Sequence, residues 1–218
     1  MNFDENNKLK TVTHVKDIFD GAQSITSDWT TGKIYWTVSS NKQFSIKVID
    51  ESFEKLEYII QPNNKTYMGK LRVYPKQDEL FFLSDDKLWY TSNSLNSNAS
   101  LLFESGKEFQ KIDDFTIDYA TDKLYLIESF EGHSILKHID IGTSGRPLNV
   151  NDIDEIGRIP FSGHNLVAFN NKIYWTLFKD RVSILYFKNN NEPAVEITNL
   201  SGNSRLSFVS SSCPCGYN

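Results

Sequence analysis

The sequence predicts an all-β fold, a β-propeller with four full four-stranded blades, and three observations carry this prediction. Phe, Tyr and Trp make up 13% of the 218 residues, and aromatic side chains favour the half-buried surface of a sheet. One short segment recurs four times, at intervals close to the length of a propeller blade. Turn-forming residues separate β-type runs along the chain, and helical periodicity is absent.

The recurring segment is the predicted second strand of each blade. Its copies occupy residues 33–37, 79–83, 123–127 and 172–176. The matching positions 34, 80, 124 and 173 are separated by 46, 44 and 49 residues, which suits a four-stranded blade. The motif residues expected to pack within and between the blades are Tyr35, Trp36, Phe81, Phe82, Tyr125, Glu128, Tyr174 and Trp175.

The flanks of the recurring segment repeat as well. An alternating run and a tight turn precede each copy, which predicts first strands over 24–29, 71–74, 115–119 and 166–169. Third strands are expected over 44–49, 88–91, 134–139 and 182–187, and fourth strands over 56–60, 100–103, 153–159 and 194–197. The predicted repeats therefore lie near 22–62, 70–105, 114–160 and 165–199.

Two segments, Asp28 to Thr37 and Phe169 to Thr176, resemble the repeat of the YWTD propeller family, which includes the low-density lipoprotein receptor and nidogen. Two copies of the motif retain Tyr-Trp-Thr and two are degenerate. The resemblance implies an arc of a six-bladed ring, and the alternative is a closed four-bladed ring. The family has an Asp after Tyr-Trp-Thr that hydrogen-bonds neighbouring blades, and here that position holds Val38, Ser84, Glu128 and Leu177.

The C-terminal part resembles the end of a lipoprotein-receptor propeller. Residues 205–210 are similar to the strand that closes the ring, so the blades are expected over residues 1–210. Cys213 and Cys215 fall where such receptors begin an epidermal-growth-factor-like module, which would then start in 211–218. The resemblance implies half-cystines. As metal ligands, the two cysteines would need two further soft ligands nearby, and none is found in the sequence.

Composition limits the classes of partner. The net charge of −5 and the lack of a Lys- or Arg-rich stripe argue against nucleic-acid binding. No run approaches the ~20 apolar residues of a membrane span, and the N-terminus does not resemble a signal peptide. We expect an extracellular or cell-surface ectodomain without its own signal peptide. Three glycosylation sequons permit this, at Asn64, Asn98 and Asn199.

The sequence shows no catalytic motif, and we expect neither a metal nor another cofactor. Three acidic clusters, Asp85–Asp86, Asp113–Asp114 and Asp152–Asp154–Glu155, lack the glycine-punctuated spacing of a calcium loop and are interpreted as solvated turns. His133, in His133-Ser134-Ile135, resembles a pH-sensing histidine of the penultimate receptor repeat, and His164 lies near the position of its partner. The alternative for both is an exposed loop histidine.

These observations predict a non-catalytic, ligand-binding or scaffolding module of a lipoprotein-receptor-like or matrix protein, and not an enzyme. Its partner would be a protein ligand or a neighbouring module of the same receptor. Two alternatives stay open. One is a self-contained four-bladed binding propeller similar to hemopexin, and the other is an enzyme on a six-bladed propeller.

Overall fold

A computed structural model of the protein describes residues 2–3, 9–11, 18–40, 43–50, 52–53, 55–63, 68–105, 110–130, 132–142, 153–160, 163–179, 182–189 and 192–200. The predicted closing strand, both cysteines, Asn64 and Asp152 lie outside these residues.

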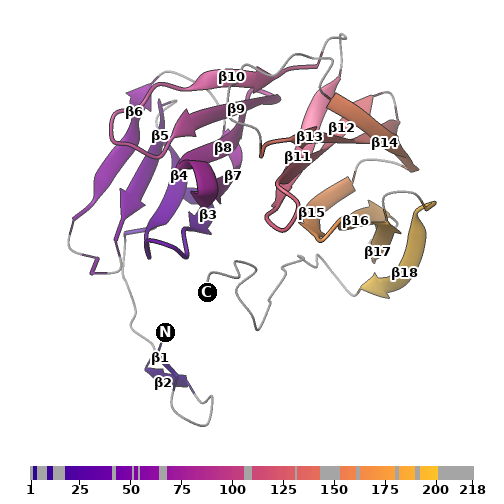
Figure 1. The fold of residues 1–218 in the computed structure, drawn as a ribbon, viewed down its shortest axis with the longest axis horizontal. Helices are drawn as coiled ribbons and strands as arrows, with labels where there is room; N and C mark the ends of the chain where they lie inside the picture. Colours follow the sequence, from indigo (N-terminus) through magenta and orange to yellow (C-terminus); the bar gives the residue numbers. More distant parts are fainter. Residues whose placement is uncertain are drawn as a thin grey trace.

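The described chain forms four antiparallel four-stranded sheets, each built from four strands that are consecutive in the chain (Figure 1). The first sheet holds β3 (Ala22–Ser27), β4 (Ile34–Ser40), β5 (Gln43–Ile49) and β6 (Glu57–Asn63). The second holds β7 (Met68–Tyr74), β8 (Glu79–Ser84), β9 (Lys87–Ser92) and β10 (Ser100–Phe103). The third holds β11 (Lys111–Asp118), β12 (Lys123–Phe130), β13 (His133–Asp140) and β14 (Ile153–Pro160). The fourth holds β15 (Gly163–Phe169), β16 (Lys172–Lys179), β17 (Val182–Asn189) and β18 (Val195–Leu200).

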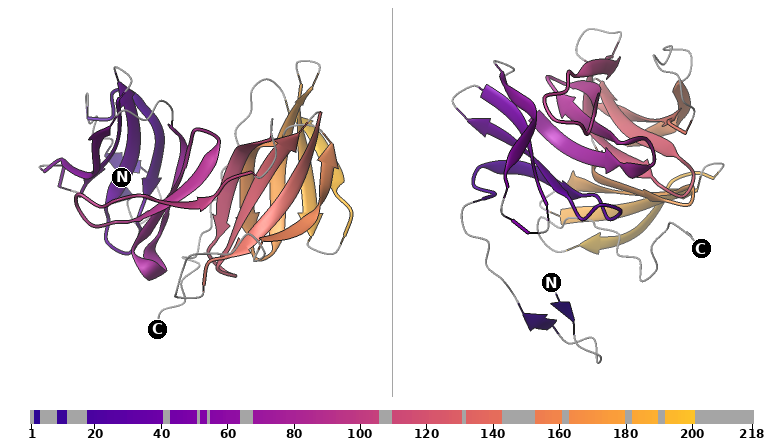
Figure 2. Two further views of the ribbon diagram at one scale, coloured as in Figure 1. Left: turned by 90° about the horizontal axis from the view of Figure 1, so that it is seen from above. Right: turned by 60° about the vertical axis from the view of Figure 1, so that its left-hand side comes forward.

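Two further elements complete the secondary structure. A short pair, β1 (Asn2–Phe3) and β2 (Leu9–Thr11), precedes the sheets, and a 3₁₀ turn, η1 (Pro75–Gln77), joins β7 to β8. No helix that could span a lipid bilayer occurs in the part of the chain that the structure describes. Figure 2 shows the four sheets following one another in chain order across the molecule.

The all-β, four-times-four prediction is confirmed, and each of the predicted first to fourth strands of the four repeats has a counterpart. The motif aromatics Tyr35, Phe81, Tyr125 and Tyr174 occupy equivalent positions on the second strands. Each pairs with a residue on the first strand of its sheet, respectively Thr26, Arg72, Thr116 and Val167. The repeat in the sequence is thus a repeat in strand register.

Tight hairpins with left-handed residues connect many of these strands. Asp85 and Asp86 join β8 to β9 with φ of 51° and 59°. Asn170 and Asn171 join β15 to β16 with φ of 50° and 63°. Asp and Asn tolerate this conformation better than other side chains that carry a Cβ, and two positive φ values match the twist of a two-residue hairpin.

Adjacent sheets bury their facing surfaces in three apolar cores. Side chains alternate across a strand, so neighbouring residues of one motif, such as Phe81 and Phe82, pack in different cores. The equivalent aromatic residue of each of the first three sheets packs toward the sheet that follows. Tyr35 belongs to the core between the first and second sheets, Phe81 to that between the second and third, and Tyr125 to that between the third and fourth. All three are fully buried, whereas Tyr174 is only partly buried. Among the described residues no buried cluster joins the fourth sheet to the first.

The two motif tryptophans are packing residues. Trp36 and Trp175 both have 0% of their surface exposed. Trp175 lies in the core between the third and fourth sheets and stacks on Tyr186, with ring centroids 5.7 Å apart. Trp36 contacts the edge of Phe19 at 4.8 Å. Their recurrence along the chain therefore reflects sheet packing.

Candidate functional site

The first strands of the four sheets, β3, β7, β11 and β15, lie nearest the centre and contact one another in sequence. One position repeats on these strands, two residues before the partner of the motif aromatic. It holds Ser24, Lys70, Asp114 and Asn165. All four positions are polar, so the centre of the molecule is lined by hydrogen-bonding and charged groups.

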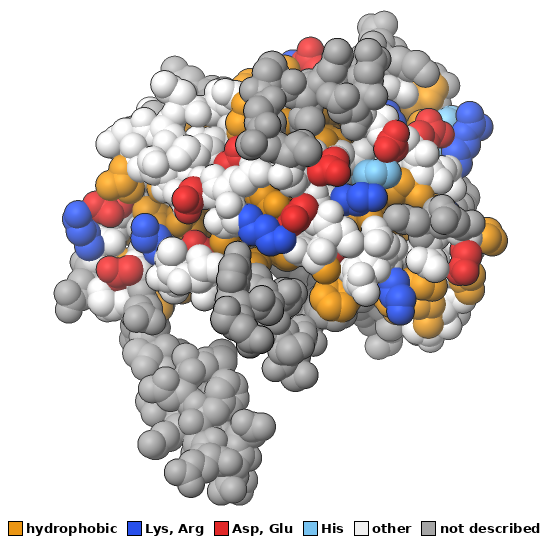
Figure 3. Space-filling model, viewed as in Figure 1, with side chains coloured by type: hydrophobic (Ala, Val, Ile, Leu, Met, Phe, Trp, Pro, Cys, Tyr) orange, Lys and Arg blue, Asp and Glu red, His pale blue; other side chains and the backbone are white. Residues whose placement is uncertain are grey.

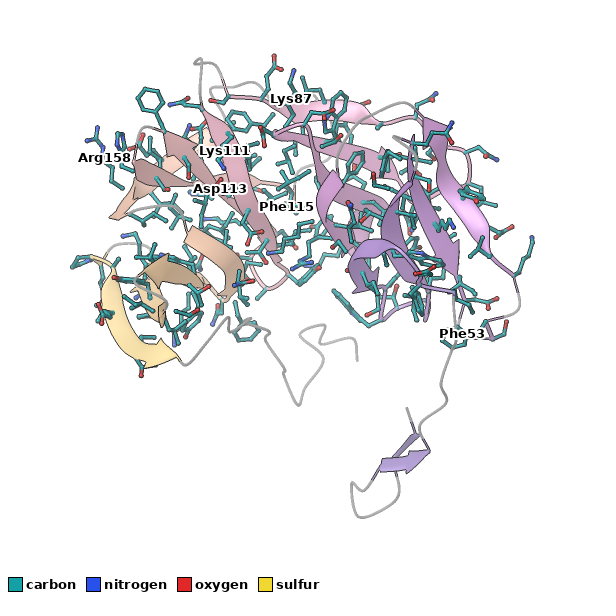
Figure 4. All side chains as sticks on the ribbon, turned by 180° about the vertical axis from the view of Figure 1, so that it is seen from behind. Phe53, Lys87, Lys111, Asp113, Phe115 and Arg158 are labelled. Carbon is teal, nitrogen blue, oxygen red and sulfur yellow. The ribbon has the colours of Figure 1, made fainter. Side chains whose placement is uncertain are left out.

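These four residues line a cavity of about 850 Å³ at the end where the inner strands begin. The remainder of its wall comes from the starts of β3, β7 and β11 and from the β8–β9 hairpin. The other lining residues are Ala22, Gln23, Ile25, Gly69, Arg72, Leu83, Ser84, Asp85, Asp86, Lys111, Ile112 and Asp113. Figure 4 shows how Lys111, Asp113 and Phe115 follow one another along β11. The cavity is mixed in character, with charged groups set among aliphatic side chains.

Lys70 connects three sheets across this cavity. Its Nζ lies 2.7 Å from Asp114 Oδ1 on β11 and donates to the Leu166 carbonyl oxygen on β15 at 3.1 Å. Only 17% of the Lys70 side chain and 9% of the Asp114 side chain are exposed. Burial lowers the pKa of Lys70 to about 8, although the charge of Asp114 opposes this shift.

Both carboxylate oxygens of Asp114 accept hydrogen bonds from backbone amides. Its Oδ1 accepts from the Phe115 amide at 2.8 Å, and its Oδ2 accepts from the Leu166 amide at 2.7 Å. In the first sheet, Ser24 Oγ accepts from the Leu71 amide in the same geometry at 3.0 Å. At this polar position, Ser24 therefore joins the first sheet to the second, and Asp114 joins the third sheet to the fourth.

Asp118, at the other end of β11, binds the next sheet in a second way. Its two oxygens accept from the amides of Asn170 and Asn171 at 3.0 and 2.7 Å. Both amides belong to the β15–β16 hairpin. Contacts between sheets are thus made by carboxylates of the inner strands as well as by the apolar cores.

Glu128, the one carboxylate at the position of the family's Asp, pairs within its own sheet. It is buried, and Lys137 Nζ on β13 lies 2.5 Å from its Oε2. The same ammonium lies 5.5 Å from the ring centre of Phe103 in the second sheet. In the described part of the chain, Lys137 therefore links Glu128 to the neighbouring sheet.

Aromatic side chains occupy the opposite end of the inner strands. Trp29, after β3, meets the edge of Tyr119, after β11, with ring centroids 4.7 Å apart. Tyr119 Oη donates to the Val73 carbonyl oxygen at 2.9 Å, and burial raises the pKa of Tyr119 to about 12. Residues from three sheets therefore meet at this end of the inner strands.

Of the two predicted histidines, His133 does not line this cavity. His133 begins β13, and its ring meets the edge of Phe130 at 5.8 Å. His164 lies in β15, paired with Thr176, and its side chain is outside the described part. The pH-sensing role of both histidines stays a prediction.

The sequons and acidic clusters have mixed outcomes. Asn98 is exposed between β9 and β10, and Asn199 lies in β18. Asp85–Asp86 form a hairpin turn, as predicted. The interpretation of Asp113–Asp114 as a solvated turn is wrong, because they lie inside β11 and Asp114 is buried. Among the described residues no group of three or more His, Cys, Asp or Glu side chains could hold a metal ion.

Lys70 and Asp114 are the site residues that motif reasoning missed. A signal for them exists: Ser24, Lys70 and Asp114 each precede the matching motif position by ten residues (34 − 24, 80 − 70, 124 − 114). Comparison of the repeats at that offset would have indicated a polar inner-strand position. It would not have shown that Lys70 and Asp114 touch, since this depends on how the sheets are arranged.

Comparison with known proteins places the fold. No family model matches the chain. Among solved structures, oligogalacturonate lyase from Vibrio parahaemolyticus has a TM-score of 0.58 and 9% identity, covering 81% of this chain and 51% of that one. TolB from Acinetobacter baumannii has a TM-score of 0.56 and 15% identity, covering 79% and 41%. These are β-propellers. The chain has a β-propeller fold.

A third similar structure is nidogen in a complex with laminin, at 11% identity, covering 83% of this chain and 80% of that one. Its TM-score of 0.44 is too low to support a closer relationship. The YWTD assignment therefore stays a resemblance in sequence. The chain spans about half the length of the lyase and less than half that of TolB, so the activity and partners of the whole protein are matters for proposal.

The prediction that this chain is not an enzyme is wrong on this comparison. Propellers that share its fold include oligogalacturonate lyase, which is an enzyme by name. The error came from treating the absence of a known motif as the absence of chemistry. One fold can carry both binding sites and catalytic sites, so the lack of a known motif does not exclude catalysis.

Proposed function

We propose that this chain is a ligand-binding propeller and that its site is the polar cavity at the beginning of the inner strands. The observation that carries the proposal is the cavity itself. Its volume of about 850 Å³ lies in the range of ligand pockets, ~300–1,000 Å³, and convergent polar groups from four sheets line it.

The charges of the wall favour a ligand with both donors and acceptors. Three cationic side chains, Lys70, Arg72 and Lys111, face four carboxylates, those of Asp85, Asp86, Asp113 and Asp114. Lys70 pairs with Asp114 and Lys111 with Asp113. Figure 3 shows the same interspersion of acidic and basic side chains over one face of the molecule. A polyanion would gain little here, whereas amide and hydroxyl groups find partners of both kinds.

The partner that we propose is a protein segment, presented by a protein ligand or by a neighbouring module of the same receptor or matrix protein. The Tyr-Trp-Thr motifs and their resemblance to lipoprotein-receptor repeats support this class. The same resemblance supports an ectodomain, with Asn98 available as an exposed glycosylation acceptor.

A second candidate is catalysis in the same cavity. One observation favours it: an amine with a lowered pKa and a carboxylate lie 2.7 Å apart in the cavity wall. Titratable pairs of this kind cluster at functional sites.

The proposal is tested by a nuclear magnetic resonance titration with N-acetyl tripeptide amides of varied central residue. We expect amide shifts to gather at Ser24, Lys70 and Asp114. Gln23→Trp, which places a bulky ring at an exposed position of the cavity wall, should abolish them, whereas Gln43→Trp, at an exposed position outside the cavity, should preserve them. Shifts that cluster elsewhere, or that survive in Gln23→Trp, would refute the proposed site.

A further inference from the structure

We propose that Lys70 is a reactive amine, which forms an imine with an aldehyde group on a ligand in the cavity. The inference rests on the proposed function, because it takes the cavity as the ligand site. It adds a residue with a chemical role and a class of ligand, a carbonyl compound.

The hydrogen bonds of Lys70 suit a neutral amine as well as an ammonium. An ammonium has three N–H groups, whereas a neutral amine has two N–H groups and one lone pair. Asp114 Oδ1 and the Leu166 carbonyl oxygen can each accept one N–H. Loss of the third proton therefore breaks neither contact and leaves a lone pair available for attack.

The surroundings of Lys70 favour the neutral amine more than water does. The Nζ is largely desolvated, and Arg72 on the same strand adds a second positive charge. Asp114 opposes both effects. Besides Asp114, the equivalent positions of the inner strands hold the uncharged side chains Ser24 and Asn165. The remaining charged groups of the wall are the Lys111–Asp113 pair and the hairpin residues Asp85 and Asp86.

The resulting pKa of about 8 has a chemical consequence. Roughly one Lys70 in ten carries the neutral amine at pH 7, against fewer than roughly one in a thousand for a lysine at its ordinary value. Lysines that are desolvated or that lie next to another cation are known nucleophiles toward carbonyl groups.

The reaction balances without an oxidant or a reductant. Lys70 releases a proton to solvent, and its lone pair adds to the carbonyl carbon. Asp114, 2.7 Å from the nitrogen, accepts one N–H proton and passes it to the new alkoxide, which gives a carbinolamine. A proton from solvent then lets the hydroxyl leave as water, and the nitrogen lone pair forms the C=N bond. The iminium cation that results faces the Asp114 carboxylate, as the ammonium did.

Lys111 provides an internal control in the same cavity. Its side chain is 56% exposed and pairs with Asp113 at 3.1 Å. The hydrogen bond to Asp113 raises the pKa of Lys111. The greater solvent exposure of Lys111 therefore favours its labelling by a reagent in solution, whereas the larger fraction of neutral amine favours labelling of Lys70.

The experiment treats the folded chain with propionaldehyde and sodium cyanoborohydride at pH 7, and peptide mass spectrometry gives the labelling rate at each lysine. We expect Lys70 to be labelled at least ~10-fold faster than Lys111, because its fraction of neutral amine is larger. Its rate should rise with pH and level off above pH 8, whereas that of Lys111 should still be rising. Lys70→Arg removes the fast site, and Lys55→Arg, at an exposed position outside the cavity, leaves the rate of Lys70 unchanged. Equal or slower labelling of Lys70 would overturn the proposal.

Asp114→Asn tests the proton transfer. Loss of the negative charge should move the midpoint of the Lys70 profile to lower pH, while the plateau rate falls at least ~10-fold. An unchanged plateau would contradict the transfer. Tripeptide-induced amide shifts without fast labelling would refute the proposed reactivity of Lys70 and would still support the cavity as a ligand site. Fast labelling without such shifts would refute the peptide-binding function instead.

Discussion

Truncation of Trp175 tests the packing between sheets most directly. Its side chain is fully buried in the core between the third and fourth sheets, where it stacks on Tyr186. A buried aromatic removes ~150–250 Å² from water, and the lower value at about 25 cal/mol per Å² corresponds to roughly 4 kcal/mol. Its Nε1 has no hydrogen-bond partner among the described residues, so no such bond is lost on truncation. We expect Trp175→Ala to lower the free energy of unfolding by about 3–5 kcal/mol.

The assay is equilibrium unfolding in urea, followed by far-ultraviolet circular dichroism. Trp175→Phe keeps an aromatic ring against Tyr186 and should lose less than half as much stability. Trp29→Ala is the matched control, because Trp29 is 38% exposed and lies at the end of the inner strands. A loss below about 1 kcal/mol for Trp175→Ala would show that this position does not hold the sheets together.

Three further predictions use the same measurement. Asp118→Ala should cost about 2–4 kcal/mol, because it leaves the amides of Asn170 and Asn171 without their carboxylate; a cost near zero would contradict its role between sheets. Lys70 binds its proton more weakly in the folded state, so the stability of the wild type should rise between pH 8 and 10.5, by at most roughly 3 kcal/mol relative to Lys70→Arg; parallel pH curves for the two proteins would refute this. Asp86→Gly should stabilise the chain by about 0.5 kcal/mol, since φ is +59° there and glycine adopts this conformation without strain; destabilisation would mean that the Asp86 side chain matters more than its backbone.

The strands could be predicted from the sequence because each is specified locally. Around Phe81, as around Tyr35, apolar residues stand between turn formers at the spacing of one strand, and no distant contact is needed to recognise it. The equivalent register of the motif aromatics then follows from the regular spacing of the repeats.

The cavity could not be predicted in this way, since its groups meet only after the sheets have assembled. Lys70, Asp114 and Leu166 are far apart in the chain and belong to three sheets. Asp113–Asp114 was misinterpreted for a related reason. Two adjacent acids suggest a turn, yet Ile112 and Phe115 on either side are buried strand residues. A bulge between Ile112 and Asp114 lets both acids find partners within the protein.

The partial burial of Tyr174 has a consequence for how the molecule opens. Its counterparts Tyr35, Phe81 and Tyr125 are each sealed by the sheet that follows. In an array whose units contact only their neighbours, stability is a sum of unit and junction contributions, and a unit with one junction opens more readily than a unit with two. We therefore expect amide hydrogen exchange to be slowest in β8 and β12 of the middle sheets and faster in β16 and β17. The fourth sheet would then separate under denaturant before the middle sheets, and the cavity wall would lose Asn165 and the contacts with Leu166.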